Sequence, residues 1–259
     1  MKFPPPAPIH PLDKSSVPLH PARITRDSPP TMKRSPSLPS GHGRFLLGIG
    51  AVYLLFTVLL GISPRNRTDW WMEHFIIAFG LTILFATSRW FVFSKTSYLF
   101  AFAFLCLHSV GAHYTYSEVP YREWWTAIAG ASVTGPDQTD PRNHFDRAIH
   151  FLYGVLFTRP YREAFYFALK PRRDFWSHLV VLTFIMATSL FYELLEWAAA
   201  VLYGGEAGMA FLGTQGDVWD AHKDTLLASI GALVGSLGMM LRLLFTGSDP
   251  ARTWGESRA

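Results

Sequence analysis

The chain contains few charged residues for its length. Of its 259 residues, 16% are Asp, Glu, Lys or Arg, compared with about 25% in an ordinary globular protein. Aromatic residues reach 15%. Little charge with many aromatic residues is typical of membrane proteins, whose lipid-facing surface is apolar and whose interfaces are rich in Trp and Tyr.

Cysteine is nearly absent, and the net positive charge is small. Cys106 is the single cysteine, which excludes an internal disulfide and a four-cysteine zinc fold. The net charge of +4 is dispersed along the chain, so nucleic acid is not expected as a partner. The apolar composition excludes a fully disordered chain.

Proline is concentrated at the N-terminus, where 11 of the 18 prolines lie in the first 39 residues. We expect residues 1–43 to form a disordered cytoplasmic tail, because this composition buries too little apolar surface to offset its conformational entropy. A proline-rich ligand for a partner is the alternative, and Met32 offers an alternative start. Residues 44–246 are then a transmembrane domain, followed by a short C-terminal tail at 247–259.

Six apolar segments predict an all-α fold, a polytopic membrane helix bundle of about six transmembrane helices. A spanning helix needs about 20 apolar residues. The segments are 45–62, 71–87, 97–116, 143–158, 175–202 and 223–245. The fourth is short, and we expect it to end at Arg159-Pro160, because proline disrupts a helix interior. Residues 161–169 then form an amphipathic piece along the membrane surface.

The distribution of Lys and Arg predicts the orientation. Basic residues are more frequent in the two tails and in the loops after the second and fourth segments, whereas residues 203–222 contain none. By the positive-inside rule, both termini are cytoplasmic and loop 203–222 lies outside.

This orientation brings polar residues of several segments to one depth. Glu193 lies 18 residues after Phe175, about 27 Å along a helix, and therefore in the outer leaflet. The fourth and sixth segments begin on the same side. The candidate catalytic residues at this depth are Asp146, His150, Glu193, Glu196, Asp220 and Asp224.

The spacing of these residues places them on shared helix faces. Asp146 and His150 are four residues apart, and Glu193 and Glu196 three, so each pair lies on one face. An unpaired charge in lipid costs at least about 2.5–3.5 kcal/mol, so a divalent cation is one expected partner. The candidate metal ligands are His113, His150, Glu193, Asp217, Asp220 and Asp224.

Each feature also has a purely structural interpretation. The two pairs could be an ion pair and an interhelical hydrogen bond, and the aspartates could cap the sixth helix. His108 is expected to be a satisfied core histidine. We expect Tyr116 and the pair Trp124-Trp125 to anchor the chain at the interface. Small residues at Gly231, Gly235 and Gly238 predict close helix contact.

Four segments carry a resemblance to a known family. HSVGAHYTY (108–116), NHFDRAIHFLYG (143–154), YELLEW (192–197) and FLGTQGDVWDAHKD (211–224) resemble the YjdF-type bacterial inner-membrane proteins, over about residues 45–245. This implies a multi-pass protein of the bacterial inner membrane.

A more distant similarity is to VanZ-like membrane proteins, which are associated with glycopeptide resistance. Asp146-Arg147-x-x-His150-Phe151 matches their first pattern. Glu193-x-x-Glu196 has Glu where that family has Gln, and Asp224-x3-Ala228-x2-Gly231-x3-Gly235 has Ala where it has Asn.

Three functions agree with these observations. The first is an enzyme or binding site at the outer leaflet for a phospholipid or a lipid-linked envelope glycan, because carboxylates beside histidine serve as acid and base or as cation ligands. The second is a proton- or ion-coupled transporter of small solutes. The third is a scaffold whose polar network only locks helix packing. Membrane lipids are partners in all three, and the sequence leaves the oligomeric state open.

Overall fold

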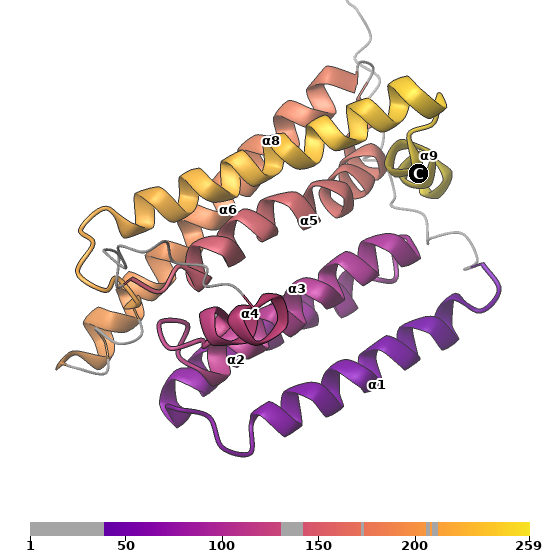
Figure 1. Ribbon diagram of the computed structural model, residues 1–259. Helices are drawn as coiled ribbons and strands as arrows, with labels where there is room; N and C mark the ends of the chain where they lie inside the picture. The colour runs from indigo at the N-terminus through magenta and orange to yellow at the C-terminus, as the bar shows by residue number, and fades with distance from the viewer. Residues whose placement is uncertain (1–38, 131–141, 172–173, 206–207, 209–211) are drawn as a thin grey trace, which may run out of the picture. The chain divides into compact units, whose positions relative to one another are not determined.

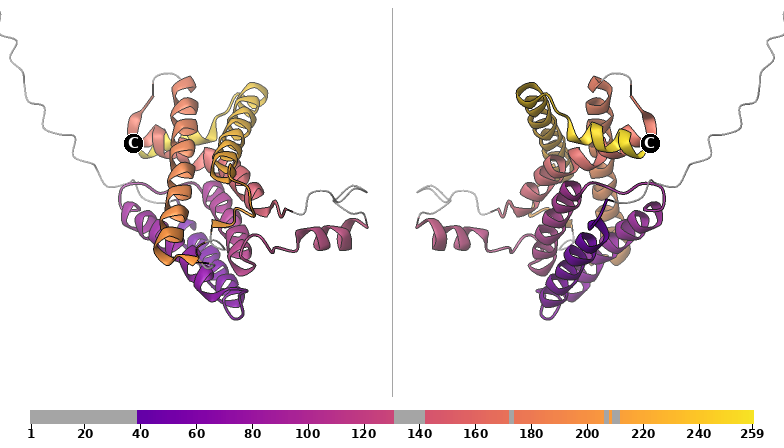
Figure 2. Two further views of the ribbon diagram at one scale, coloured as in Figure 1. Left: turned by 90° about the vertical axis from the view of Figure 1, so that its left-hand side faces the viewer. Right: turned by 90° about the vertical axis from the view of Figure 1, so that its right-hand side faces the viewer.

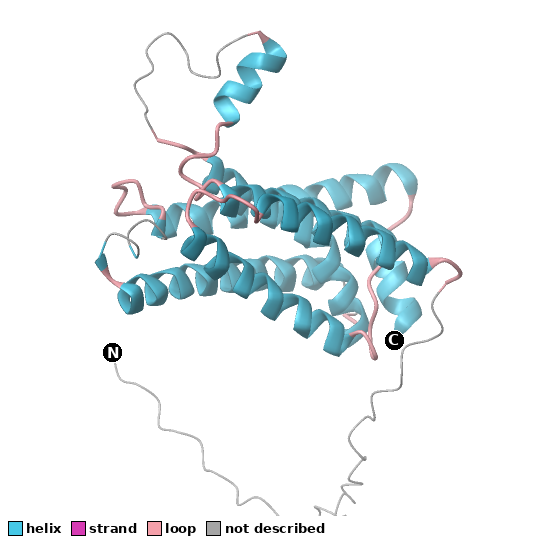
Figure 3. Cartoon of the chain, turned by 90° about the horizontal axis from the view of Figure 1, so that it is seen from below, coloured by secondary structure: helices cyan, strands magenta, loops and turns pink. Residues whose placement is uncertain are grey.

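The computed structural model describes residues 39–130, 142–171, 174–205, 208 and 212–259. The chain divides into two units, residues 1–33 and 34–259. The first unit, like most of the predicted N-terminal tail, lies outside the described residues. The second unit is all-helical over its described residues, with eight helices and no strand (Figures 1 and 3).

Each of the six predicted apolar segments forms a helix. These helices are α1 (His42–Leu60), α2 (Arg67–Thr87), α3 (Lys95–His113), α5 (Phe145–Leu169), α6 (Asp174–Tyr203) and α8 (Asp220–Thr246). Two helices were not predicted, α4 (Tyr121–Ala129) and α9 (Pro250–Arg258), the latter in the expected C-terminal tail.

Four of these helices, α1, α2, α6 and α8, are long and apolar enough to cross a membrane. The structure therefore fits a membrane helical bundle, but it does not confirm six spans. Helix α5 is less apolar than these four helices. Its position explains this, because it packs against α3, α6, α8 and α9 (Figure 1). A helix surrounded by other helices can carry many polar residues without exposing them to lipid.

Helix α5 does not end at Pro160, and the prediction of a stop there was wrong. The helix continues to Leu169. Beyond the proline, Glu163 is fully buried and accepts hydrogen bonds from the Ser94 backbone N–H at 2.9 Å and the Ser94 hydroxyl at 2.6 Å. These contacts with the start of α3 favour continuation of the helix, because packed neighbours compensate for the bond that proline removes. Residues 161–169 are consequently part of the bundle rather than a separate surface piece.

Glycines bring α5 and α8 into direct backbone contact. A Cβ at Gly231 would lie 2.1 Å from the Phe151 carbonyl oxygen, and one at Gly154 would lie 2.0 Å from the Ala228 carbonyl oxygen. The close contact predicted for Gly231 is therefore present, and so is that of Gly235, whose Cβ would meet Thr158. Gly238 has no such neighbour within 4 Å, so the prediction was wrong there.

Helix α9 is held by a buried arginine at the end of the bundle away from the predicted site. Arg162 of α5 donates to Asp174 at 2.5 Å and to Asp249 at 2.7 Å. Asp249 also caps α9 through the backbone N–H of Ala251. The Trp254 indole donates to the Val92 carbonyl at 2.9 Å. The C-terminal helix is thus anchored to α5 and to the segment that precedes α3.

Helix α4 lies apart from the long helices in the side views of Figure 2. Trp124, Trp125 and Ile128 are exposed on it. This exposure agrees with the interface role expected for the two tryptophans. Tyr116 differs, because it is only 9% exposed and faces the interior. Its predicted role as an interface anchor was wrong, since the chain folds back after α3 and its hydroxyl contacts the buried His108.

Candidate functional site

Polar residues of α5 and α6 meet around the His150 imidazole, near the start of α5. Its Nε2 lies 3.3 Å from Glu193 Oε1 and 3.7 Å from Asp146 Oδ1. Its Nδ1 lies 3.3 Å from the Ser189 hydroxyl, one turn before Glu193. The structure therefore brings together the two pairs that the sequence placed on separate helices.

Asp224 of α8 completes a group that could hold a metal ion. Asp146, His150 and Asp224 each offer one donor atom, and these atoms lie within 4.8 Å of one another. Asp224 is 1% exposed, and its Oδ1 accepts no hydrogen bond from any described residue; nor does Glu193 Oε1. Two buried carboxylate oxygens without donors are costly, and a cation would compensate both.

Two predicted residues, Asp217 and Asp220, instead face basic side chains at the edge of the group. Asp220 pairs with Arg142 and lies 3.4 Å from Arg147. Asp217 pairs with Arg147 and with Lys223, both at 2.5 Å. The hydrogen bond from Lys223 is the largest of several contributions that lower the pKa of Asp217 to about 2. Their negative charge is largely balanced by these pairs.

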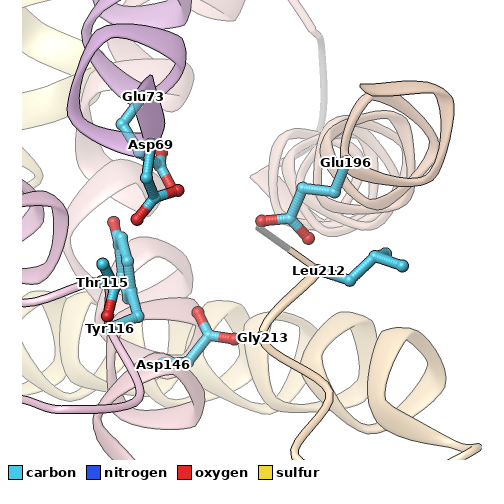
Figure 4. A pocket seen from close by; sticks show the side chains of 8 residues that line it. All are labelled: Asp69, Glu73, Thr115, Tyr116, Asp146, Glu196, Leu212 and Gly213. Atoms are coloured by element: carbon cyan, nitrogen blue, oxygen red, sulfur yellow. The ribbon is translucent and has the colours of Figure 1, made fainter. Parts of the chain in front are cut away.

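His113, a candidate metal ligand, is not among the residues that meet here. Its Nδ1 donates to the Leu60 carbonyl at 2.7 Å, which ties the end of α3 to the end of α1. Glu196 does belong to the group, and its side chain lines a cavity together with Asp146 (Figure 4).

Sequence reasoning missed the contribution of α2. Asn66 caps this helix by accepting from the Asp69 backbone N–H at 3.2 Å, which sets Asp69 in the first turn. Glu73, four residues later, is buried and accepts from the Tyr192 hydroxyl at 2.8 Å. His108 Nε2 lies 3.5 Å from Glu73. The i, i+4 spacing of Asp69 and Glu73 at the predicted outer end of the second segment was the available signal.

These acidic residues surround a small cavity (Figure 4). Its walls are formed by Asp69 and Glu73 of α2, Asp146 of α5 and Glu196 of α6, together with Thr115, Tyr116, Leu212 and Gly213. It has room for roughly one water molecule or ion. Four carboxyl groups around so little space cannot all carry unbalanced charge, because each buried charge needs a partner.

Comparisons with known proteins agree with this membrane architecture. Residues 45–244 match the family described as "Predicted membrane protein (DUF2238)". The chain belongs to this family. It is also 32% identical over 183 residues to the inner membrane protein YjdF of Escherichia coli strain K12, covering 69% of this chain and 81% of the relative. The resemblance to YjdF-type proteins is thereby confirmed, as is a membrane location. No solved structure matches the chain.

Proposed function

We propose that this protein is a cation-dependent membrane enzyme that acts on a phosphate-bearing lipid, either a phospholipid or a lipid-linked envelope glycan. The observation that carries the proposal is the convergence of Asp146, His150 and Asp224, with donor atoms within 4.8 Å and a buried Asp224 oxygen that has no donor among the described residues. Carboxylates with one imidazole suit a divalent ion such as Mn²⁺ or Mg²⁺.

The surrounding side chains give each group a chemical role. Asp146, His150 and Asp224 would hold the ion, which would stabilise negative charge on a phosphate group. Glu193 lies beside His150 and its Oε1 has no hydrogen-bond donor among the described residues. It is therefore the candidate general base, able to accept a proton from water or from a substrate hydroxyl.

Basic residues beside the site support an anionic substrate. Arg147 and Lys223 share Asp217, and the Lys223 side chain is 47% exposed. A phosphate could replace Asp217 as their partner, because Arg and Lys both bind phosphate oxygens well. The distribution of Lys and Arg along the sequence supports a site open to the extracytoplasmic side, and the VanZ-like sequence patterns support an envelope-linked substrate.

A proton-coupled transporter is the second candidate, and a second polar chain favours it. Beyond Glu73 and His108, the adjacent His74 ring lies 3.5 Å from the Ser109 hydroxyl, which lies 3.3 Å from the Tyr53 hydroxyl. This row reaches from the acidic group across α3 to α1. Chains of ionisable groups inside a bundle are the usual elements of proton relays.

The test combines cation binding with function in the full-length protein. Detergent-purified wild type should bind Mn²⁺, and Asp224→Asn should weaken binding at least 10-fold, as loss of an anionic ligand requires. Glu193→Gln should fold and insert normally, retain the ion, and fail to release headgroup phosphate from bacterial lipid extract or to complement a gene deletion. Glu118→Gln, which removes an exposed carboxylate paired with Arg65, is the control.

Three results would count against the proposal. Absence of Mn²⁺ binding, or equal binding by Asp224→Asn, removes the metal site. Full complementation by Glu193→Gln at normal protein level favours the scaffold, because a neutral amide cannot act as a base. Cation-driven solute uptake by reconstituted vesicles, without any lipid product, favours the transporter.

A further inference from the structure

The cavity has an acidic wall that the ion proposed for Asp146, His150 and Asp224 would not use. Asp69 and Glu73 of α2 face Asp146 and Glu196 across it (Figure 4). The donors therefore come from three helices, and three of the four carboxyl groups lie outside the set that would hold the proposed ion. Sites built from side chains on facing helices are the usual form of metal centres in helical bundles.

Asp69 is the observation that points to a ligand here. The residue is 4% exposed, and its carboxylate points into the cavity (Figure 4). No hydrogen bond or ion pair of its carboxylate is found among the described residues, although its backbone N–H donates to the Asn66 side chain. A buried ionised carboxylate without a donor is strongly disfavoured, so this side chain must either hold a proton or bind a cation.

We infer that the cavity binds a second divalent cation, adjacent to the first, through Asp69, Glu73 and Glu196, with Asp146 shared between the two ions. This inference rests on the proposed function, because Asp146 is also a ligand in the first group. The cavity admits roughly one ion. The four side chains proposed as ligands of the second ion are all carboxylates, and carboxylate oxygens are the ligands of hard cations such as Mg²⁺ and Mn²⁺.

A pair of ions also balances more of the negative charge of the whole group than a single ion does. Six carboxyl groups converge on this end of the bundle, and one divalent ion would leave most of their negative charge unbalanced. The six are Asp69, Glu73, Asp146, Glu193, Glu196 and Asp224. Paired ions that share a carboxylate are a recurrent solution for reactions at phosphate, where they stabilise the attacking and leaving oxygens.

The experiment measures Mn²⁺ stoichiometry and magnetic coupling in the full-length protein in detergent. Wild type should bind two Mn²⁺ per chain and give the spin-coupled electron paramagnetic resonance spectrum of an adjacent pair. Asp69→Asn should bind one, with an uncoupled spectrum. Asp224→Asn should also lose one, and Asp146→Asn should lose both. Glu118→Gln should match wild type, and detergent melting temperatures establish that each variant is folded.

The outcomes separate this inference from the function on which it rests. One Mn²⁺ per chain in wild type, lost in Asp224→Asn and retained in Asp69→Asn, overturns the second site and leaves the first intact. Two uncoupled ions also overturn it, because the ions would not be adjacent. No binding at all removes both. If Asp69→Asn does not fold, Glu73→Gln replaces it as the variant that should bind one Mn²⁺, and the wild-type spectrum still shows whether two ions are adjacent.

Discussion

Replacement of Gly231 by alanine should open the contact between α5 and α8. The added Cβ would lie 2.1 Å from the Phe151 carbonyl oxygen and 3.1 Å from the Gly154 Cα. Both neighbours are backbone atoms, so no side chain can rotate away. Relief requires the two helices to separate locally by roughly 1 Å, and overpacking of this kind costs about 1–3 kcal/mol. We expect a loss near the upper end of this range.

The same separation should weaken cation binding. Asp146 and His150 lie on α5, and Asp224 lies on α8. The proposed cation ligands therefore come from the two helices that meet at Gly231. Ligand groups must be held to within about 0.5 Å for a productive site. Gly231→Ala should therefore lower both the thermal stability in detergent and the affinity for Mn²⁺, although the residue touches neither ligand nor ion.

Gly238→Ala on the same helix is the matched control. A Cβ at Gly238 meets nothing within 4 Å, and alanine is more favourable than glycine within a helix by about 0.5–1 kcal/mol. This variant should be as stable as wild type or more stable, with unchanged Mn²⁺ affinity. Equal unfolding temperatures for Gly231→Ala and Gly238→Ala would refute the assigned backbone contact.

Two further predictions concern orientation and pH. The orientation can be tested in a variant whose Cys106 is replaced by alanine. A cysteine introduced at the exposed Val218 should react with a membrane-impermeant thiol reagent in intact cells, whereas a cysteine at the exposed Ser257 should not. The reverse pattern would place the acidic group on the cytoplasmic side. The pKa of Asp217 is lowered to about 2, chiefly by Lys223, so its stabilising contribution is complete above the usual pKa near 4 and is lost as the pH falls through about 2. The difference in melting temperature between wild type and Asp217→Asn should accordingly be constant from pH 8 to pH 5 and disappear near pH 2, and a difference already lost at pH 5 would contradict this pairing.

Local pattern and length were enough to predict the six long helices. Each apolar run is bounded by polar or helix-ending residues, and a run that lies in lipid is helical because its backbone N–H and C=O groups must be satisfied within the segment. Counting residues from the ends of the runs also placed Asp146, His150 and Glu193 at one depth, and the structure brings them together. Depth along a helix follows from rise per residue alone.

Two kinds of feature could be seen only in the tertiary structure. One is the neighbour that each face of a helix meets, and the other is contact between segments that are distant in the sequence. The role of α2 in the acidic group depends on which face Asp69 and Glu73 turn toward α5 and α6, and a nearly uniform apolar helix carries little information about this. The continuation of α5 beyond Pro160 depends on partners such as Ser94, which lies 69 residues from Glu163 in the sequence. The contact of Gly154 with α8 depends on which glycine lies opposite it. Sequence periodicity reports local propensity, whereas these three features arise from packing energies between segments that only the folded bundle brings together.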